Sequence, residues 1–174
     1  RYAPTHGIVY RGGVYAIEGD ATAATYFLAA AAILGGRACV TNLRADSPQG
    51  DVHFADILGR MGCRVRQGFL AGRRGIEVSR DPGAKLQAVT VDLNDMPDVA
   101  QTLATVALFA EGTSRFINIG NLRIKETDRL KALATELTRL GASVVEGPDE
   151  LEITPGPARD AAIETYDDQI GRAS

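Results

Sequence analysis

The chain has 174 residues, of which 45% are hydrophobic and 24% are charged, so it can form one buried core and is neither disordered nor fibrous. Its 19 basic and 22 acidic residues are spread along the chain and give a net charge of −3, which argues against a nucleic-acid-binding surface. The longest apolar run, residues 26–34, is far shorter than the roughly 20 residues that a membrane helix needs. The composition therefore predicts a single globular domain with neither nucleic acid nor membrane as a partner.

Metal-binding and disulfide patterns are absent from the sequence. Cys39 and Cys63 are too few for a disulfide framework or a cysteine-based zinc site, and His6 and His53 have no second ligand at a suitable spacing. We therefore expect no metal and a reducing, cytoplasmic setting.

The chain begins with a helix and a strand. Asp20 can cap a helix over residues 22–34, and Gly35-Gly36 can end it. Residues 37–43 then show the pattern of a strand.

A second helix and a hairpin follow. The apolar face of this helix recurs at helical spacing in Phe54, Ile57, Leu58 and Met61. Gly62 can end the helix, and residues 63–65 and 76–78 predict a hairpin around a basic, exposed loop at residues 68–75.

The second half of the chain repeats this order of elements. A strand over residues 87–93 precedes a helix, and residues 115–119 form the next strand. The apolar face of the helix consists of Val99, Leu103, Val106 and Ala110. The stripe of the following helix consists of Leu130, Leu133, Leu137 and Leu140. Gly141 can end that helix, and strands at residues 143–145 and 151–153 flank a turn.

Glycines that end corresponding elements in the two halves lie at similar offsets, Gly36 with Gly112 and Gly62 with Gly141. We interpret this as a duplication of a βαβαββ unit, at about residues 14–81 and 87–155. A third unit begins at about residue 160 and is cut off at the end of the chain.

Charged residues gather at two places in the second half. Lys125 and Arg129 are four residues apart, so they would share one face at the positive end of a helix if that helix begins near Lys125. Glu126 and the earlier Asp98 add carboxyl groups suited to proton transfer. Such a cluster can bind an anionic ligand.

A purely structural interpretation fits the same residues. The segment from Lys125 to Arg129 is also typical of a solvated first helical turn with Thr127 or Asp128 as its cap, and Asp98 could be only an N-cap.

Three segments carry a resemblance to a known family. The Glu18-Gly19-Asp20 start of the alanine-rich helix, the Pro97-Asp98 turn and Lys125-Glu126-Thr127-Asp128-Arg129 resemble the 5-enolpyruvylshikimate-3-phosphate synthases, or 3-phosphoshikimate 1-carboxyvinyltransferases. The resemblance implies an α/β prism, an inside-out barrel of βαβαββ units with helices inside and sheets outside. Residues 1–174 would then form most of the C-terminal domain of a two-domain enzyme whose N-terminal domain is missing.

The resemblance also implies an activity and roles for particular residues. The family transfers the enolpyruvyl group of phosphoenolpyruvate to the 5-hydroxyl of shikimate 3-phosphate in aromatic amino acid biosynthesis, without a metal or organic cofactor, and is the target of glyphosate. Asp98 would accept the hydroxyl proton and Glu126 would protonate the methylene carbon. Asn121 and Lys125 would hold shikimate 3-phosphate, and Arg129 would bind phosphoenolpyruvate.

The chain departs from the family at its end. Where the family continues with Asp-His-Arg, this chain has Asp168-Gln169-Ile170, and Arg172 lies two positions too late to replace the family's arginine. A non-catalytic ligand-binding or complementing domain is therefore an alternative. A UDP-N-acetylglucosamine enolpyruvyl transferase is a second one, and the Lys-Glu-Thr-Asp-Arg element argues against it.

Overall fold

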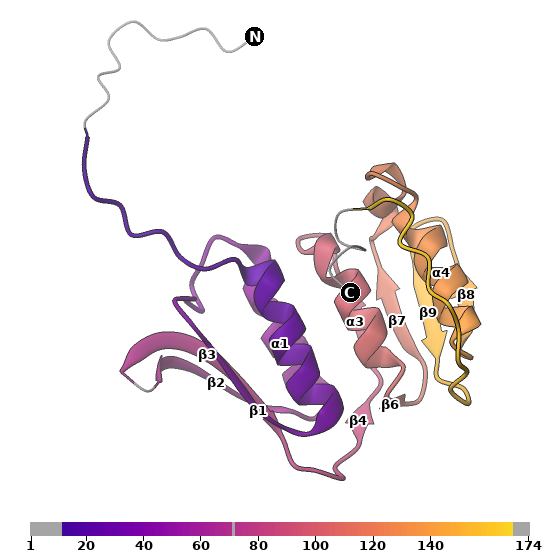
Figure 1. The fold of residues 1–174 in the computed structure, drawn as a ribbon, viewed down its shortest axis with the longest axis horizontal. Helices are drawn as coiled ribbons and strands as arrows, with labels where there is room; N and C mark the ends of the chain where they lie inside the picture. Colours follow the sequence, from indigo (N-terminus) through magenta and orange to yellow (C-terminus); the bar gives the residue numbers. More distant parts are fainter. Residues whose placement is uncertain (1–11, 71, 169–174) are drawn as a thin grey trace, which may run out of the picture.

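Helices and strands alternate along the chain in a mixed α/β fold, which the computed structural model describes over residues 12–70 and 72–168 (Figure 1). The helices are α1 (Ala21–Leu34), η1 (Gly50–His53), α2 (Phe54–Arg60), η2 (Pro97–Val99), α3 (Ala100–Ala107), η3 (Gly120–Ile124) and α4 (Arg129–Arg139). The strands are β1 (Gly36–Thr41), β2 (Arg64–Leu70), β3 (Arg73–Arg80), β4 (Leu86–Gln87), β5 (Thr90–Asp92), β6 (Ala110–Glu111), β7 (Ser114–Ile117), β8 (Ser143–Glu146) and β9 (Leu151–Thr154).

The strands form two larger sheets and one short pair. In the first half, β3 lies between β1 and β2, and both pairings are antiparallel. In the second half the order is β5-β7-β9-β8, with β5 and β7 parallel and the other pairs antiparallel. The short parallel pair β4-β6 lies where the chain passes from one half to the other (Figure 1).

Helices α1 and α3 contact each other and lie between the two larger sheets (Figure 1). Helix α1 packs on β1 and β3, and α3 contacts α4 and β9. A single cluster of buried apolar side chains runs through both halves, so the helices and both sheets share one core.

Several predicted elements are confirmed. Helix α1 is capped by Asp20, whose Oδ1 accepts a hydrogen bond from the backbone N–H of Ala23 at 3.1 Å. The four apolar residues predicted for the second helix are all buried. Leu130 and Leu137 of α4 are buried as well, while Leu133 is only partly buried.

The predicted helix that included Ala110 is wrong at its end. Helix α3 stops at Ala107, where the N–H groups of Leu108 and Phe109 turn back to the carbonyls of Thr105 and Val106. Ala110 lies instead in β6, paired with Leu86. The single strand predicted over residues 87–93 is also split, because β4 pairs with β6 while β5 pairs with β7.

The hairpin is longer than predicted. Most of the expected loop at residues 68–75 belongs to β2 and β3, and Gly68 pairs with Gly75. A side chain at Gly75 would collide with the backbone carbonyl of Val40 in β1, so glycine lets the three strands pack closely.

Within the described part of the chain before α1 there is no strand, although a βαβαββ unit starting near residue 14 would have one there. Residues 12–20 lie outside helices and strands, and the side chains of Val14, Tyr15 and Ile17 are exposed. Across the described part of the chain, no helix is both long and apolar enough to cross a lipid bilayer.

Candidate active site

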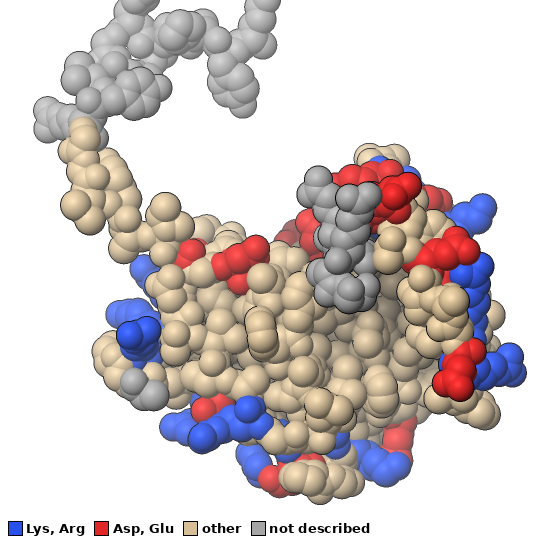
Figure 2. Space-filling model, in the orientation of Figure 1, with Lys and Arg blue, Asp and Glu red and all other residues tan. Residues whose placement is uncertain are grey.

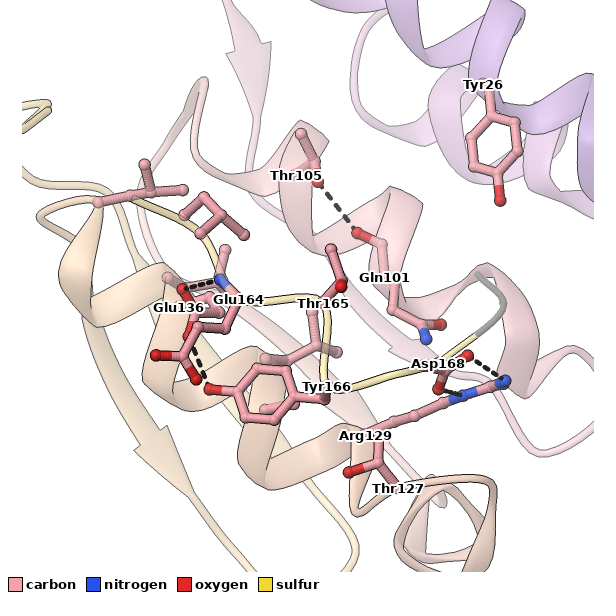
Figure 3. Close-up of a pocket in the computed structure, with 15 residues that line it drawn as sticks. Tyr26, Gln101, Thr105, Thr127, Arg129, Glu136, Glu164, Thr165, Tyr166 and Asp168 are labelled. Atoms are coloured by element: carbon pink, nitrogen blue, oxygen red, sulfur yellow. Dashed lines mark hydrogen bonds and ion pairs between the residues drawn. The ribbon is translucent and has the colours of Figure 1, made fainter. Parts of the chain in front are cut away.

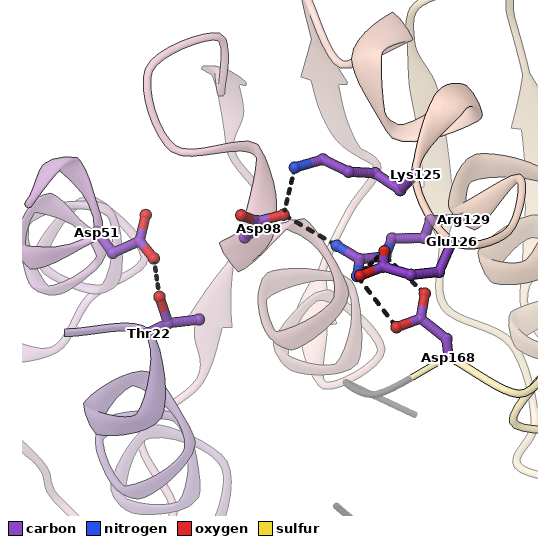
Figure 4. A network of polar contacts seen from close by, with 7 residues as sticks. All are labelled: Thr22, Asp51, Asp98, Lys125, Glu126, Arg129 and Asp168. Carbon is purple, nitrogen blue, oxygen red and sulfur yellow. Dashed lines mark hydrogen bonds and ion pairs between the residues drawn. The ribbon is translucent and has the colours of Figure 1, made fainter. Parts of the chain in front are cut away.

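Asp98 is the point at which the two charged segments meet (Figure 4). It lies in η2, after Pro97, whose fixed φ suits the first turn of a helix. Its Oδ1 forms an ion pair with Lys125 Nζ at 3.2 Å and accepts a hydrogen bond from Arg129 Nη1 at 2.9 Å. The structure therefore brings together three of the residues singled out from the sequence.

Arg129 is the most deeply buried charge of the cluster, with 4% of its side chain exposed. Its Nε and Nη2 donate to the two carboxylate oxygens of Asp168, at 2.6 Å and 3.0 Å. Its Nη2 also donates to Glu126 Oε2 at 2.7 Å. Burial on its own lowers the pKa of Arg129, but the carboxylates of Asp168, Glu126 and Asp98 raise it overall, so the guanidinium stays charged.

The helix on which Arg129 lies starts after Lys125. Helix α4 begins at Arg129 itself, and Asp128 is its N-cap, because Asp128 Oδ1 accepts from the backbone N–H of Lys131 at 3.0 Å. Lys125 precedes the helix in an extended conformation. The condition under which Lys125 and Arg129 would share one helical face is therefore not met, and the alternative in which Asp128 caps the helix is confirmed. Asp98 is what joins Lys125 and Arg129.

Asn121 is separate from this cluster. It lies in η3 and is exposed. In the described ranges it makes no hydrogen bond to Asp98, Lys125, Glu126 or Arg129. A role for Asn121 in holding a ligand remains a prediction.

Two carboxyl groups near the cluster were not identified from the sequence as site residues. Asp168 is 39 positions from Arg129 in the chain, so only the path of the folded chain reveals their contact. Asp51 lies in η1 and accepts a hydrogen bond from the hydroxyl of Thr22 (Figure 4). Burial raises the pKa of Asp51, the hydrogen bond from Thr22 opposes that shift, and the charges of Asp98 and Asp20 add to it.

A cavity of about 440 Å³ adjoins the cluster (Figure 3). It lies between α3, α4 and residues 163–168, with Tyr26 of α1 among its lining residues. Thr127, Arg129 and Asp168 belong both to the cavity wall and to the charged site. The other lining residues combine aliphatic side chains of α4 with two glutamates, Glu136 and Glu164. This cavity is therefore less suited to a highly charged anion than the face of the cluster that Asp98 and Lys125 form.

Carboxylates outnumber cations in the cluster. Lys125 and Arg129 face Asp98, Glu126 and Asp168, so the formal charge is negative when all five are ionised. Figure 2 shows acidic side chains along this edge of the molecule, whereas the face over α1 and α3 is nearly free of charge. The cluster needs further cations if it is to bind a strongly anionic ligand tightly.

The described residues contain no group of three or more histidine, cysteine, aspartate or glutamate side chains arranged to hold a metal ion. Gln169, Ile170 and Arg172, where the sequence departs from the family pattern, lie outside the described residues.

Comparison with known proteins supports one family. Residues 4–173 match the family described as EPSP synthase (3-phosphoshikimate 1-carboxyvinyltransferase). The chain is 52% identical over 167 residues to a 3-phosphoshikimate 1-carboxyvinyltransferase of Sodalis glossinidius, covering 94% of this chain and 37% of that protein. It is 51% identical over 171 residues to the same enzyme of Ralstonia nicotianae, covering 93% of this chain and 38% of that protein. The chain therefore spans little more than a third of these relatives.

Solved structures show a similar fold at lower sequence identity. An EPSP synthase from Acinetobacter baumannii matches with a TM-score of 0.61 and 23% identity, covering 80% of this chain and 32% of that one. The enolpyruvyl transferase NikO from Streptomyces tendae matches with a TM-score of 0.54 and 20% identity, covering 83% of this chain and 32% of that one. These two similarities concern the fold alone.

Proposed function

Because the chain belongs to the EPSP synthase (3-phosphoshikimate 1-carboxyvinyltransferase) family, we propose that it supplies half of the active site that joins phosphoenolpyruvate to shikimate 3-phosphate. The observation that carries this proposal is the cluster of Asp98, Lys125, Glu126 and Arg129, in which two cations and two carboxylates from separate segments converge. Its residue types suit the reaction, which unites two anions and moves two protons.

The proposed reaction is an addition followed by an elimination. The 5-hydroxyl oxygen of shikimate 3-phosphate attacks C2 of phosphoenolpyruvate, Asp98 accepts the hydroxyl proton, and Glu126 delivers a proton to the methylene carbon. The resulting methyl group then returns its proton to Glu126 while the C–O bond to phosphate breaks and its electron pair stays on the phosphate oxygen. The proton taken up by Asp98 leaves with the phosphate, so both carboxyl groups are restored when the enolpyruvyl ether is released. No electron acceptor or metal is needed for this balance, and we propose no cofactor.

For substrate binding we propose the roles that the family resemblance implies. We assign Lys125 and Asn121 to shikimate 3-phosphate and Arg129 to the carboxylate or phosphoryl group of phosphoenolpyruvate, since arginine can bind either group with two parallel hydrogen bonds. The excess of carboxylates in the cluster supports a further expectation. Cations from a further domain, corresponding to the part of the relatives that this chain does not span, would complete the binding of both substrates.

We further propose that residues 1–174 are most of one α/β prism domain, with βαβαββ units at about residues 14–81 and 87–155 and a third from about residue 160. The placement of α1 and α3 between two sheets supports this arrangement. So does the nearly uncharged face over these helices (Figure 2). Phe27 of α1 and Phe109, which follows α3, are also exposed. The remainder of such a domain would cover that face. We place the parent enzyme in the cytoplasm.

Two alternatives remain distinct from this proposal. A non-catalytic ligand-binding or complementing domain would bind a substrate or a partner half without turnover, which fits the coverage of little more than a third of the relatives. A UDP-N-acetylglucosamine enolpyruvyl transferase would use the same donor with another acceptor.

The experiment is a chimera in which residues 4–168 of this chain replace the matched segment of the Sodalis glossinidius relative. We expect phosphate release from phosphoenolpyruvate with shikimate 3-phosphate but not with UDP-N-acetylglucosamine. Asp98→Asn and Glu126→Gln should each lower kcat by about 10²–10⁴-fold, the usual contribution of a positioned acid or base. A folded chimera that binds both substrates but releases no phosphate would favour the non-catalytic domain.

A further inference from the structure

We propose that Asp168 is the positioning residue for Arg129. In this proposal, which rests on the function proposed above, Asp168 holds one edge of the guanidinium and thereby presents the other edge to the carboxylate of phosphoenolpyruvate. Asp168 itself would not touch the substrate.

The guanidinium has two edges that can each bind a carboxylate in two parallel hydrogen bonds. Asp168 occupies the edge formed by Nε and Nη2, through both of its oxygens, at 2.6 Å and 3.0 Å. The edge formed by Nη1 and Nη2 faces Asp98 and Glu126, each of which accepts one hydrogen bond. Only this second edge is shared between two separate carboxylates.

The exposed fraction of each side chain also separates Asp168 from Asp98 and Glu126. The side chain of Asp168 is 5% exposed, whereas those of Asp98 and Glu126 are 38% and 49% exposed. A ligand carboxylate can therefore replace Asp98 and Glu126 on the second edge, because both can turn toward water. Replacing Asp168 would leave a buried charge without its partner, which is strongly unfavourable.

The backbone before Asp168 is shaped to deliver it. Residues 163–168 run along α4, where Glu136 accepts from the backbone N–H of Glu164 at 3.3 Å and from the hydroxyl of Tyr166 at 2.6 Å (Figure 3). Tyr166 and Asp167 then both adopt left-handed conformations, with φ of 55° and 56°. Such conformations are unfavourable for residues other than glycine and often occur at functional sites. Here they turn the chain so that the Asp168 side chain lies beside Arg129 and lines the cavity.

The first experiment observes the arginine side chains of the 174-residue chain by NMR, with Arg129→Lys used to assign the Arg129 Nε–H signal. We expect this N–H to exchange slowly with water. It should stay protected at phosphoenolpyruvate concentrations that are high enough to shift the backbone signals of Glu126 and Arg129, because the Asp168 edge is retained. In Asp168→Asn, exchange should be about tenfold faster, as expected for the loss of one charge-assisted hydrogen bond. Asp167→Asn is the matched control, because it removes the neighbouring exposed charge and asparagine tolerates a left-handed conformation.

The second experiment measures kinetics in the active chimera. Asp168→Asn should raise KM for phosphoenolpyruvate by about tenfold or more, with little change in kcat and in KM for shikimate 3-phosphate, because uniform binding of one substrate is weakened. Asp168→Glu should restore part of the loss, and Asp167→Asn should change neither constant.

The outcomes separate the two proposals. An inactive chimera would contradict the proposed function, while the NMR result on the isolated chain would still test the role of Asp168. If phosphoenolpyruvate releases the Arg129 Nε–H in the wild-type chain, the substrate replaces Asp168 and the positioning role is wrong. That measurement needs no variant, so it holds even if Asp168→Asn does not fold. Equal effects of Asp168→Asn on both KM values and on kcat would indicate a merely structural ion pair.

Discussion

Arg129 organises the candidate site because one buried guanidinium contacts three carboxylates from three parts of the chain. Removing one partner of such a buried pair typically costs roughly 3–5 kcal/mol, since the other charge is left without compensation. We therefore expect the ion pairs to fix the orientation of the Arg129 side chain more than they increase the free energy of unfolding. They fix the position of α4 relative to η2 through side chains that can also act on a substrate.

Asp51 provides a prediction about pH. Burial raises its pKa in the folded protein, so the folded state binds the Asp51 proton more tightly than the unfolded state. The contribution of Asp51 to the free energy of unfolding is therefore fully present below the pKa that Asp51 has in the unfolded chain. It is lost as the pH rises through the higher pKa that Asp51 has in the folded protein. Asp51→Asn cannot ionise and can still accept from Thr22. We expect its advantage over the wild type to grow from about pH 3 to about pH 7, the range that contains the carboxyl titration, in urea unfolding.

Asp46 is a control of opposite sign. The hydrogen bond from Arg44 lowers the pKa of Asp46 to about 2. A lowered folded pKa contributes stability above the unfolded pKa and loses it as the pH falls, so Asp46→Asn should be less stable than the wild type near neutral pH and equal to it in acid. If Asp51→Asn followed the pH dependence of Asp46→Asn, the burial assigned to Asp51 would be wrong.

Much of the candidate site could be predicted from the sequence, because Lys125, Glu126 and Arg129 are close together in the chain and the family resemblance added Asp98. The structure confirms that Asp98, Lys125, Glu126 and Arg129 lie together. Asp168 could not be found in this way, since its contact with Arg129 depends on a left-handed turn and on the path of residues 163–168 over α4. Local patterns carry no information about such distant contacts.

At the scale of elements, helix ends are the best-defined features. Both α1 and α4 begin directly after an aspartate whose carboxylate accepts from a backbone N–H three residues later. Neither helix has an acidic residue in its first turn, so the free N–H groups there depend on capping side chains. In α1, Gln49 Oε1 adds a second cap by accepting from the backbone N–H of Ala21 at 2.8 Å. The aspartate cap explains why the sequence placed the start of α1 correctly.

Replacing the cap of α1 tests this directly. Asp20→Ala should lower the free energy of unfolding by about 1 kcal/mol, the usual value of an N-cap. Asp20→Asn is the matched control, because it removes the same charge but keeps an oxygen that can accept from Ala23 N–H. Urea unfolding of both variants gives the comparison. Equal stability of the two variants would show that the charge of Asp20, and not its hydrogen bond, is what matters.

Strands were harder to predict than helices, because the bounds of a strand depend on the strand with which it pairs. The single expected strand over residues 87–93 divides because its first part follows β6 and its second part follows β7. The expected hairpin loop is mostly strand because β1 supports β3 as far as Gly75. In both cases the partner strand decides the structure, and the sequence of the segment alone does not identify that partner.

At the scale of the whole molecule, the two halves meet close to the candidate site. Gly50 in η1 lies so close to the backbone carbonyl of Asp95 that a Cβ atom there would overlap it. Through this contact the Asn94-Asp95 turn packs on the first half of the chain. The contact therefore also helps to position Asp98, which follows the turn in η2. The charged cluster thus depends on packing between halves as well as on its own ion pairs.

Gly50→Ala should therefore affect both stability and the site. Forcing a methyl group into a packed contact typically costs about 1–3 kcal/mol, and relief of the overlap would move Asp95 and with it Asp98 away from Lys125 and Arg129. The measurement is urea unfolding together with the amide NMR signals of Asp95 and Asp98. Gly12→Ala is the control, because no atom lies within 4 Å of a Cβ atom at that position. If Gly50→Ala matched this control in stability and left both signals unchanged, the position of Asp98 would depend on the second half of the chain alone.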